Sequence, residues 1–153
     1  SSTTSADVAA EHMDETGPAP GFRRSNLGGA AQHTGQCSCR VEGDRVLARF
    51  AEIIRECLRQ TDSAYRYGGE EFSVILPATK GEQGIVTAER VRIALKNEIF
   101  KPRPDKDIRV TVSIGLAQHA RNEEMMDFLR RADRNLYKAK ASGKNQVCFS
   151  QQP

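Results

Sequence analysis

The feature that most constrains the fold is that every clearly periodic hydrophobic segment of the chain follows residue 41. Residues 9–40 contain neither Val nor Ile, and they include the run Gly-Pro-Ala-Pro-Gly at 17–21. Because strands favour β-branched residues in alternation, this pattern predicts a tail, a linker or poorly specified structure over residues 1–40. A short helix over Ala6–Glu15 is the one element that we expect there.

Three segments after residue 41 repeat apolar residues at helical spacing, with charged residues on the other positions. The first helix is expected to end at Thr61–Ser63, and the third near Gly143. The apolar positions are Val46, Leu47, Phe50, Ile53, Ile54, Cys57 and Leu58 in the first, Ile85, Ala88, Val91, Leu95 and Ile99 in the second, and Met125, Phe128, Leu129, Ala132 and Leu136 in the third.

Strand patterns alternate with these helices. We expect strands at 64–67, 71–76, 110–117 and 146–149, the last at a sheet edge, and a loop at Pro102 and Pro104. The pair Gly68-Gly69 between the first two strands predicts a hairpin turn. With a further strand ahead of residue 41, the order α-β-β-α-β-α-β would give an α+β fold with helices against a mainly antiparallel sheet.

Composition narrows the class of protein. No run of apolar residues is long enough to cross a membrane, and no secretory signal opens the sequence. Cys37 and Cys39 lack a second ligand pair for zinc, so reduced thiols and a cytoplasmic location are expected. The net charge is +3, but residues 1–21 carry four acids and no Lys or Arg, which leaves +7 on the rest. That balance suits an anionic ligand such as a nucleotide, or a nucleic acid, although such charge is also ordinary on a solvated surface.

The segment Arg66–Phe72 (RYGGEEF) carries the most chemical information. Two glycines leave no side chain at the tip of a hairpin, so the backbone can approach a bulky ligand. Glu70 and Glu71 follow, and one of them next to such a turn suits Mg²⁺, which takes one or two carboxylates together with substrate phosphates. An exposed hairpin with solvated glutamates is the competing interpretation.

The segment and its surroundings resemble the GGDEF family of diguanylate cyclases, in the GGEEF variant. The resemblance covers residues 41–149 in family order and spacing. Besides RYGGEEF, it includes Gly43-Asp44, Phe72–Pro77 (FSVILP), Ala88–Arg92 (AERVR), Thr111–Gly115 (TVSIG), Ala132-Asp133, Tyr137–Lys140 (YKAK) and Gly143–Asn145 (GKN).

The resemblance implies a fold and a reaction. The family has a five-stranded, mainly antiparallel sheet packed by helices, similar to polymerase palms and nucleotidyl cyclases, with a ferredoxin-like core. It condenses two GTP molecules into cyclic di-GMP and releases two pyrophosphates, with one GTP on each subunit of a homodimer. We therefore expect a GGDEF domain at residues 41–149, a C-terminal tail at 150–153, an upstream sensor or receiver domain, and no nucleic acid or membrane partner for this segment.

The resemblance also implies roles for individual residues. Glu70 takes the catalytic and metal-binding position, and Glu71 is the neighbouring metal-site acid, with Mg²⁺ (or Mn²⁺) as cofactor. Asp44 matches the acid that hydrogen-bonds guanine, although helix N-capping is an alternative. The two glycines of the motif and two lysines are also implied to bind substrate. For the lysines, the alternative is that they are ordinary cations at the C-terminal end of a helix, where they are favourable without a ligand. These four residues are Gly68, Gly69, Lys140 and Lys144.

A second site is implied by Arg59-Gln60-Thr61-Asp62, an R-x-x-D that matches the family's product-inhibition site, with Arg90 as a partner. Arginine suits such a site because its planar fork binds phosphate or guanine through two bonds. An ion pair between Arg59 and Asp62 at the end of a helix is the alternative.

The resemblance stops before Gly43-Asp44. By counting back, the family's metal aspartate falls on Leu27, its lysine on Gln32 and its guanine-binding asparagine on Gly35. Residues 1–40 are then either a tail or linker, or a degenerate N-terminal part of the GGDEF domain. Their sequence is either natural or the result of a discrete change such as a frame shift. The alternative to a cyclase is a catalytically degenerate domain that acts as a cyclic di-GMP receptor or a dimerisation module.

Overall fold

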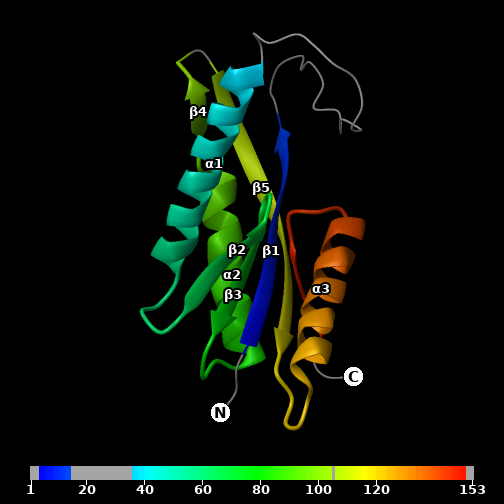
Figure 1. Ribbon diagram of the computed structural model, residues 1–153. Helices are drawn as coiled ribbons and strands as arrows, with labels where there is room; N and C mark the ends of the chain where they lie inside the picture. Colours follow the sequence, from blue (N-terminus) through cyan, green and yellow to red (C-terminus); the bar gives the residue numbers. More distant parts are fainter. Residues whose placement is uncertain (1–3, 15–35, 105, 151–153) are drawn as a thin grey trace.

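The computed structural model describes residues 4–14, 36–104 and 106–150. Helices and strands alternate along the chain (Figure 1). In chain order they are β1 (Thr4–Asp14), α1 (Gln36–Cys57), β2 (Ser63–Gly68), β3 (Glu71–Leu76), α2 (Gly81–Asn97), β4 (Phe100–Arg103), β5 (Lys106–Gln118), α3 (Met125–Ala141) and β6 (Val147–Phe149).

The sheet has the strand order β2-β3-β1-β5-β4, and every neighbouring pair in that order is antiparallel. The short β6 adds a sixth strand, parallel to β5. The predicted α+β fold with a mainly antiparallel sheet is therefore confirmed, and its five antiparallel strands carry one parallel addition.

Helices cover both faces of the sheet. Alternate residues of β5 point to opposite faces: Ile114 and Leu116 join the main core with α1 and α2, whereas Ala117 packs with Phe128 and Ala132 of α3. Leu116 also lies next to Gly84 of α2, at 3.2 Å from the position of a Cβ there. The sheet is thus buried between two helical layers, which explains why β5 is buried without interruption from Val112 to Ala117.

Two predictions for the N-terminal part were wrong. Ala6–Asp14, within the helix expected over Ala6–Glu15, belongs to β1, and α1 begins at Gln36, inside the region expected to be a tail or linker; Glu15 lies outside the described residues. β1 pairs with β3 over Thr4–Ala9 and with β5 over Thr4–Asp14, so the first half of the strand has backbone partners on both edges. Pairing with neighbouring strands therefore stabilises β1, although it lacks the β-branched alternation on which the prediction relied.

The segment around the two prolines also differs from the prediction. Pro102 lies in β4 rather than in a loop, and Ile99 lies beyond the end of α2. Among the described strands, β4 lies at an edge of the sheet and has β5 as its one neighbour. A proline is tolerated at such an edge because its missing N–H need not meet a second neighbour.

Gly115 lets α3 approach β5 closely. A Cβ at this position would lie 2.1 Å from the backbone nitrogen of Leu136 and 2.2 Å from the carbonyl oxygen of Ala132. Backbone atoms on a packed helix cannot move aside as a flexible side chain can, so α3 has to shift if any side chain is added.

We predict that Gly115→Ala lowers the free energy of unfolding by at least about 2–3 kcal/mol, the upper range for overpacking. The control is Gly43→Ala in α1, where a Cβ meets nothing within 4 Å. That substitution should be neutral or stabilise by roughly 0.5–1 kcal/mol, because alanine favours a helix over glycine. Denaturant unfolding of both variants tests this, and equal effects would contradict the close approach of α3.

A buried ion pair holds the segment between β5 and α3. Arg131 donates from Nε and Nη2 to the two carboxylate oxygens of Glu123, at 2.6 and 2.7 Å, and the two side chains are 9% and 10% exposed. The bond from Arg131, reinforced by the amide of Ala120, holds the pKa of the Glu123 carboxyl below its ordinary value. A group whose pKa is lowered by folding stabilises the protein above its unfolded pKa, and this contribution is lost as the pH falls through the folded pKa.

We predict that Glu123→Gln destabilises the domain by about 3–5 kcal/mol at neutral pH, because it leaves the Arg131 charge buried without a counter-ion. Acidification to below roughly pH 4.3 should then cost the wild-type protein more stability than the variant. The control is Asp127→Asn, whose partner Arg130 is exposed and whose loss should cost less than about 1 kcal/mol. Parallel pH profiles for Glu123→Gln and the wild type would contradict this role.

Candidate functional site

The tip of the β2–β3 hairpin is built by the RYGGEEF segment. The turn consists of Gly69 and Glu70, one residue later than predicted, because Gly68 still pairs with Glu71 at the end of the strands. Gly69 has a φ of +30°, which its missing side chain permits. The guanidinium of Arg66 donates from Nε and Nη2 to the carbonyl oxygen of Gly69, at 2.9 and 2.7 Å. Arg66 thus closes the hairpin across its own tip.

The two acids of the motif lie side by side in the chain but in different backbone settings. Glu70 belongs to the turn, and Glu71 is the first residue of β3, where it pairs with Ala9 of β1 as well as with Gly68. Both side chains are exposed, as a group that has to reach a ligand requires. Their chemistry suits a hard cation such as Mg²⁺, which prefers carboxylate oxygens.

No group of three or more His, Cys, Asp or Glu side chains that could hold a metal ion occurs among the residues that the structure describes. Glu70 and Glu71 are the donors that the described part of the hairpin offers. This set fits Mg²⁺ bound by one or two carboxylates together with phosphate oxygens, and it would not by itself form an all-protein cage.

The register of the sheet relates the hairpin tip to the end of α3. Phe72 of β3 pairs with Val8 of β1, Val8 pairs with Ile114 of β5, and Ile114 pairs with Val147 of β6. β3 and β6 run in the same direction, so the residues that precede Phe72 and those that precede Val147 lie at one edge of the part of the sheet that β3 and β6 span, while β1 and β5 continue beyond it. Three strand spacings of roughly 4.8 Å separate them by about 14 Å.

The predicted lysines belong to that edge. Lys140 is in the last turn of α3, and Lys144 lies in the short connection between α3 and β6. Figure 1 shows the end of α3 and this connection at about the same height as the hairpin tip, with β4 and the start of α1 above them. The structure therefore brings acidic and basic groups that are about 70 residues apart in sequence to the same edge of the sheet.

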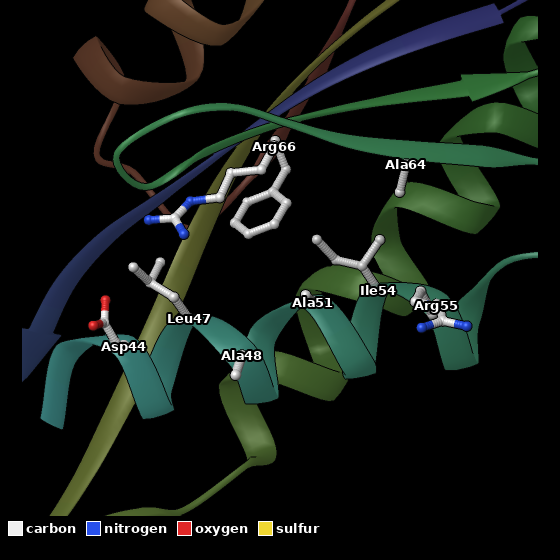
Figure 2. Close-up of a pocket in the computed structure, with 9 residues that line it drawn as sticks. Asp44, Leu47, Ala48, Ala51, Ile54, Arg55, Ala64 and Arg66 are labelled. Atoms are coloured by element: carbon white, nitrogen blue, oxygen red, sulfur yellow. The ribbon is translucent and has the colours of Figure 1, made fainter. Parts of the chain in front are cut away.

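A pocket of about 520 Å³ lies between α1 and the hairpin (Figure 2). The carboxylate of Asp44 and the guanidinium of Arg66 lie toward the same end of it. Apart from Arg55, the rest of the wall is small or apolar, and its Phe72 meets Phe50 edge to face at a centroid distance of 4.7 Å. The lining residues are Asp44, Leu47, Ala48, Ala51, Ile54, Arg55, Ala64, Arg66 and Phe72.

The sequence analysis identified Asp44 but assigned no role to Arg66 or to the alanines of the pocket. Ala48 and Ala51 lie on the surface of α1 between larger apolar residues, and Ala64 faces them from β2. Small residues on one helix face indicate either that another element packs closely against the helix or that the face forms a flat pocket wall. Only the packing of the hairpin against α1 distinguishes these two possibilities. Asp44 lies within α1, eight residues after its first residue, so helix N-capping does not explain it.

The residues of the predicted second site meet where α1 ends. The backbone amide of Arg59 donates to a carboxylate oxygen of Asp62 at 2.8 Å, and the amide of Asp62 donates back to the carbonyl of Arg59 at 3.0 Å. Arg90 of α2 donates from Nη2 to the carbonyl oxygen of Cys57, two residues before Arg59. Among the described contacts, a backbone turn therefore joins Arg59 and Asp62, in place of the ion pair that was the alternative. The Arg59 side chain is exposed.

Comparison with known proteins decides the family. A sequence model described as "Diguanylate cyclase, GGDEF domain" matches residues 40–146, more than half of the chain. The chain belongs to the GGDEF domain family. The predicted resemblance is thereby confirmed, with nearly the same boundaries.

The GGDEF match extends to curated relatives. The chain is 38% identical over 106 residues to diguanylate cyclase DgcM of Escherichia coli, 39% over 109 residues to diguanylate cyclase A of Treponema denticola, and 39% over 107 residues to the response regulator PleD of Caulobacter vibrioides. These matches cover 69%, 71% and 69% of this chain. They cover 25%, 29% and 24% of the relatives, so the chain spans about a quarter of the length of these proteins.

Solved GGDEF structures have the same fold. The diguanylate cyclase SiaD of Pseudomonas aeruginosa, solved with its activator SiaC, aligns with a TM-score of 0.73 at 26% identity and covers 97% of this chain and 50% of its own. The active GGEEF domain of a Vibrio cholerae diguanylate cyclase aligns with a TM-score of 0.72 at 20% identity and covers 99% and 85%. The palm-like fold predicted from the resemblance is confirmed.

Three GGDEF positions lie outside the described residues. These are Leu27, Gln32 and Gly35, where the family's metal aspartate, lysine and guanine-binding asparagine were expected, and their mismatch stays a sequence observation. β1, in contrast, is described and ends at Asp14, so a central strand precedes α1. No helix among the described residues is long and apolar enough to cross a membrane.

Proposed function

We propose that this GGDEF domain is a diguanylate cyclase that condenses two GTP molecules into cyclic di-GMP and releases two pyrophosphates. The observation that carries the proposal is the strand register, which brings the Glu70–Glu71 tip and the Lys140–Lys144 segment to one edge of the sheet. The pocket with Asp44 lies against the same hairpin. Together these features provide separate positions for a base, a triphosphate and a metal ion.

The pocket suits a guanine base. A planar purine would lie against the part of the wall that Ala48 and Ala51 keep free of large side chains, and the volume of about 520 Å³ is within the usual range for a small-molecule site. The carboxylate of Asp44 would accept hydrogen bonds from N1–H and the 2-amino group of guanine. Adenine lacks this pair of donors, so binding it would leave the carboxylate unpaired, which is the basis of selectivity in such sites.

The acids of the hairpin would serve the reacting groups. Glu70 and Glu71 would hold Mg²⁺ (or Mn²⁺), which when bound neutralises charge on the phosphates. Glu70 would also accept the proton of the 3′-hydroxyl as its oxygen bonds to the α-phosphorus of the other GTP. The bond from that phosphorus to the pyrophosphate oxygen breaks, and the same exchange occurs in the second half-site.

The lysines would bind the triphosphate. Lys140 and Lys144 lie at the C-terminal end of α3, where cations are favourable in any case, and a polyphosphate would be the stronger counterpart. Because each domain offers one set of groups, two copies have to face each other about a two-fold axis before both 3′-hydroxyls can react. We therefore propose a homodimer as the active state.

We further propose that an upstream sensor or receiver domain controls this dimer. The support is that the chain spans about a quarter of the length of these relatives, one of which is named a response regulator. The remaining length of those proteins gives room for a controlling domain, and dimerisation is the step on which such a domain would act.

A second candidate function is a cyclic di-GMP receptor without cyclase activity, which the cluster at the end of α1 favours. The turn Arg59–Asp62 and the anchored Arg90 provide two guanidinium groups and a carboxylate that suit guanine and phosphate. In a working cyclase the same site would give product feedback. The mismatches at Leu27, Gln32 and Gly35 are the sequence observation that favours a receptor without cyclase activity.

We predict that the protein, incubated at high concentration with GTP and Mg²⁺, forms cyclic di-GMP detectable by chromatography. Glu70→Gln should reduce turnover by at least about a hundredfold, because it removes both a metal ligand and the proton acceptor. Glu82→Gln, an exposed glutamate in the first turn of α2, is the control and should leave turnover unchanged. Absence of product from the wild type would contradict the cyclase, and an active Glu70→Gln would contradict the role of that residue.

We predict that Arg59→Ala weakens binding of cyclic di-GMP at least about tenfold, the loss expected when a charged hydrogen bond of 1.5–3 kcal/mol is removed. Arg130→Ala, an exposed arginine on α3 that pairs with Asp127, removes the same charge and should not change the affinity. Titration calorimetry with cyclic di-GMP measures both variants. Equal affinity of Arg59→Ala and the wild type would contradict the assigned product site.

A further inference from the structure

Lys144 lies in a backbone turn that is unusual in its length. Three consecutive residues have a left-handed backbone, with φ of +109° at Gly143, +61° at Lys144 and +45° at Asn145. A single left-handed residue, most often glycine, is the common way to end a helix. Two more such residues with side chains are unfavourable, so the surrounding structure has to hold them.

The end of α3 holds only the first part of this turn. The amide of Ser142 donates to the carbonyl of Lys138 at 2.9 Å, and the amide of Lys144 donates to the carbonyl of Ala139 at 3.0 Å. Beyond the turn, Gln146 is tied twice, since its Nε2 donates to the Ala139 carbonyl at 2.9 Å and its own carbonyl accepts from Ile114 of β5 at 2.9 Å. Asn145 is left between these two anchored ends.

Arg92 of α2 holds Asn145. Its Nη1 donates to the side-chain oxygen of Asn145 at 3.0 Å and lies 3.4 Å from the Asn145 carbonyl oxygen. Nε and Nη2 of the same guanidinium contact the carboxylate of Glu89 at 2.9 and 2.8 Å, which fixes the plane of the group. The Arg92 side chain is only 18% exposed, against 37% for Glu89, so the guanidinium is the more shielded partner.

We propose that Arg92 is a positioning residue for the triphosphate of GTP: through Asn145 it holds the left-handed turn that presents Lys144 at the same level of the sheet as the hairpin tip, about three strand spacings from it. The proposal rests on the proposed function, since it takes Lys144 as a triphosphate ligand. Arg92 itself acts through the turn and touches no substrate. Arg90, two residues earlier, contacts a different part of the domain, because it donates to the carbonyl oxygen of Cys57 at the end of α1.

The chemistry requires an arginine at this position. A guanidinium is a rigid planar fork that can satisfy Glu89 on one side and Asn145 on another at the same time. A lysine keeps the positive charge but offers a single point donor on a flexible stem. Arg92→Lys therefore separates the geometric role from the charge, and any loss that it causes is not a loss of electrostatic attraction for phosphate.

Two variants test the proposal in the full chain. Arg92→Lys removes the fork, and Asn145→Ala removes its acceptor; Arg130→Lys at an exposed site on α3 is the control. Three quantities are measured: amide hydrogen exchange over residues 142–146, the Kd of a non-hydrolysable GTP analogue with Mg²⁺ by calorimetry, and the KM and kcat for GTP. The double variant Arg92→Lys/Asn145→Ala completes a mutant cycle.

We expect exchange over 142–146 to rise at least about tenfold in both variants, with α3 unchanged, and the Kd for the analogue and the KM for GTP to rise by a similar factor while kcat changes less. The double variant should be no worse than either single one, because both act through one contact. If the wild type binds the analogue and both variants bind it equally well, the positioning role is overturned and the proposed function stands. Faster exchange with unchanged affinity also overturns it, and a wild type that binds no GTP analogue overturns both.

Discussion

The pairing of β1 with β3 and β5 is the constraint on which the site depends. It aligns Phe72, Val8 and Ile114 in one row across the sheet, and β6 extends the row to Val147. Because β3 and β6 run in the same direction, the segments ahead of them emerge at one edge. The acids of the hairpin and the lysines at the end of α3 are thus brought to the same level of the sheet, about three strand spacings apart, by backbone hydrogen bonds. Their register cannot slip by one residue without moving every side chain to the other face.

The packing that stabilises the domain also shapes its pocket. Phe50 and Phe72 meet edge to face and join α1 to the hairpin, while the alanines beside them leave the space that the pocket occupies. On the opposite face, Gly115 lets α3 lie directly on β5, which sets the position of Lys140 at the helix end. Stability and site geometry therefore come from the same few contacts, and a change that loosens one of them is expected to affect the other.

Sequence reasoning succeeded where a segment contained its own signal. The helix periodicities of α1, α2 and α3, the apolar β5 and the glycine hairpin were all predicted, and the order and spacing of short motifs identified the family. It failed at β1, where Thr4–Asp14 lacks β-branched alternation and forms a strand because two neighbours pair with it. It also failed at β4, whose Pro102 suggested a loop but is acceptable at a sheet edge. Those segments are determined by partners that are distant in sequence.

The sequence alone determined the fold class, the family and the residues with reactive or charged side chains, because these depend on local patterns and on motif spacing. Only the tertiary structure decided that Asp44 and Arg66 share a pocket, that Arg90 reaches the end of α1, and that Arg92 holds the turn before β6. These relations join residues between 22 and 53 positions apart, and no local pattern encodes such a distance. They arise when strand register and helix packing bring separate segments together and satisfy their polar groups.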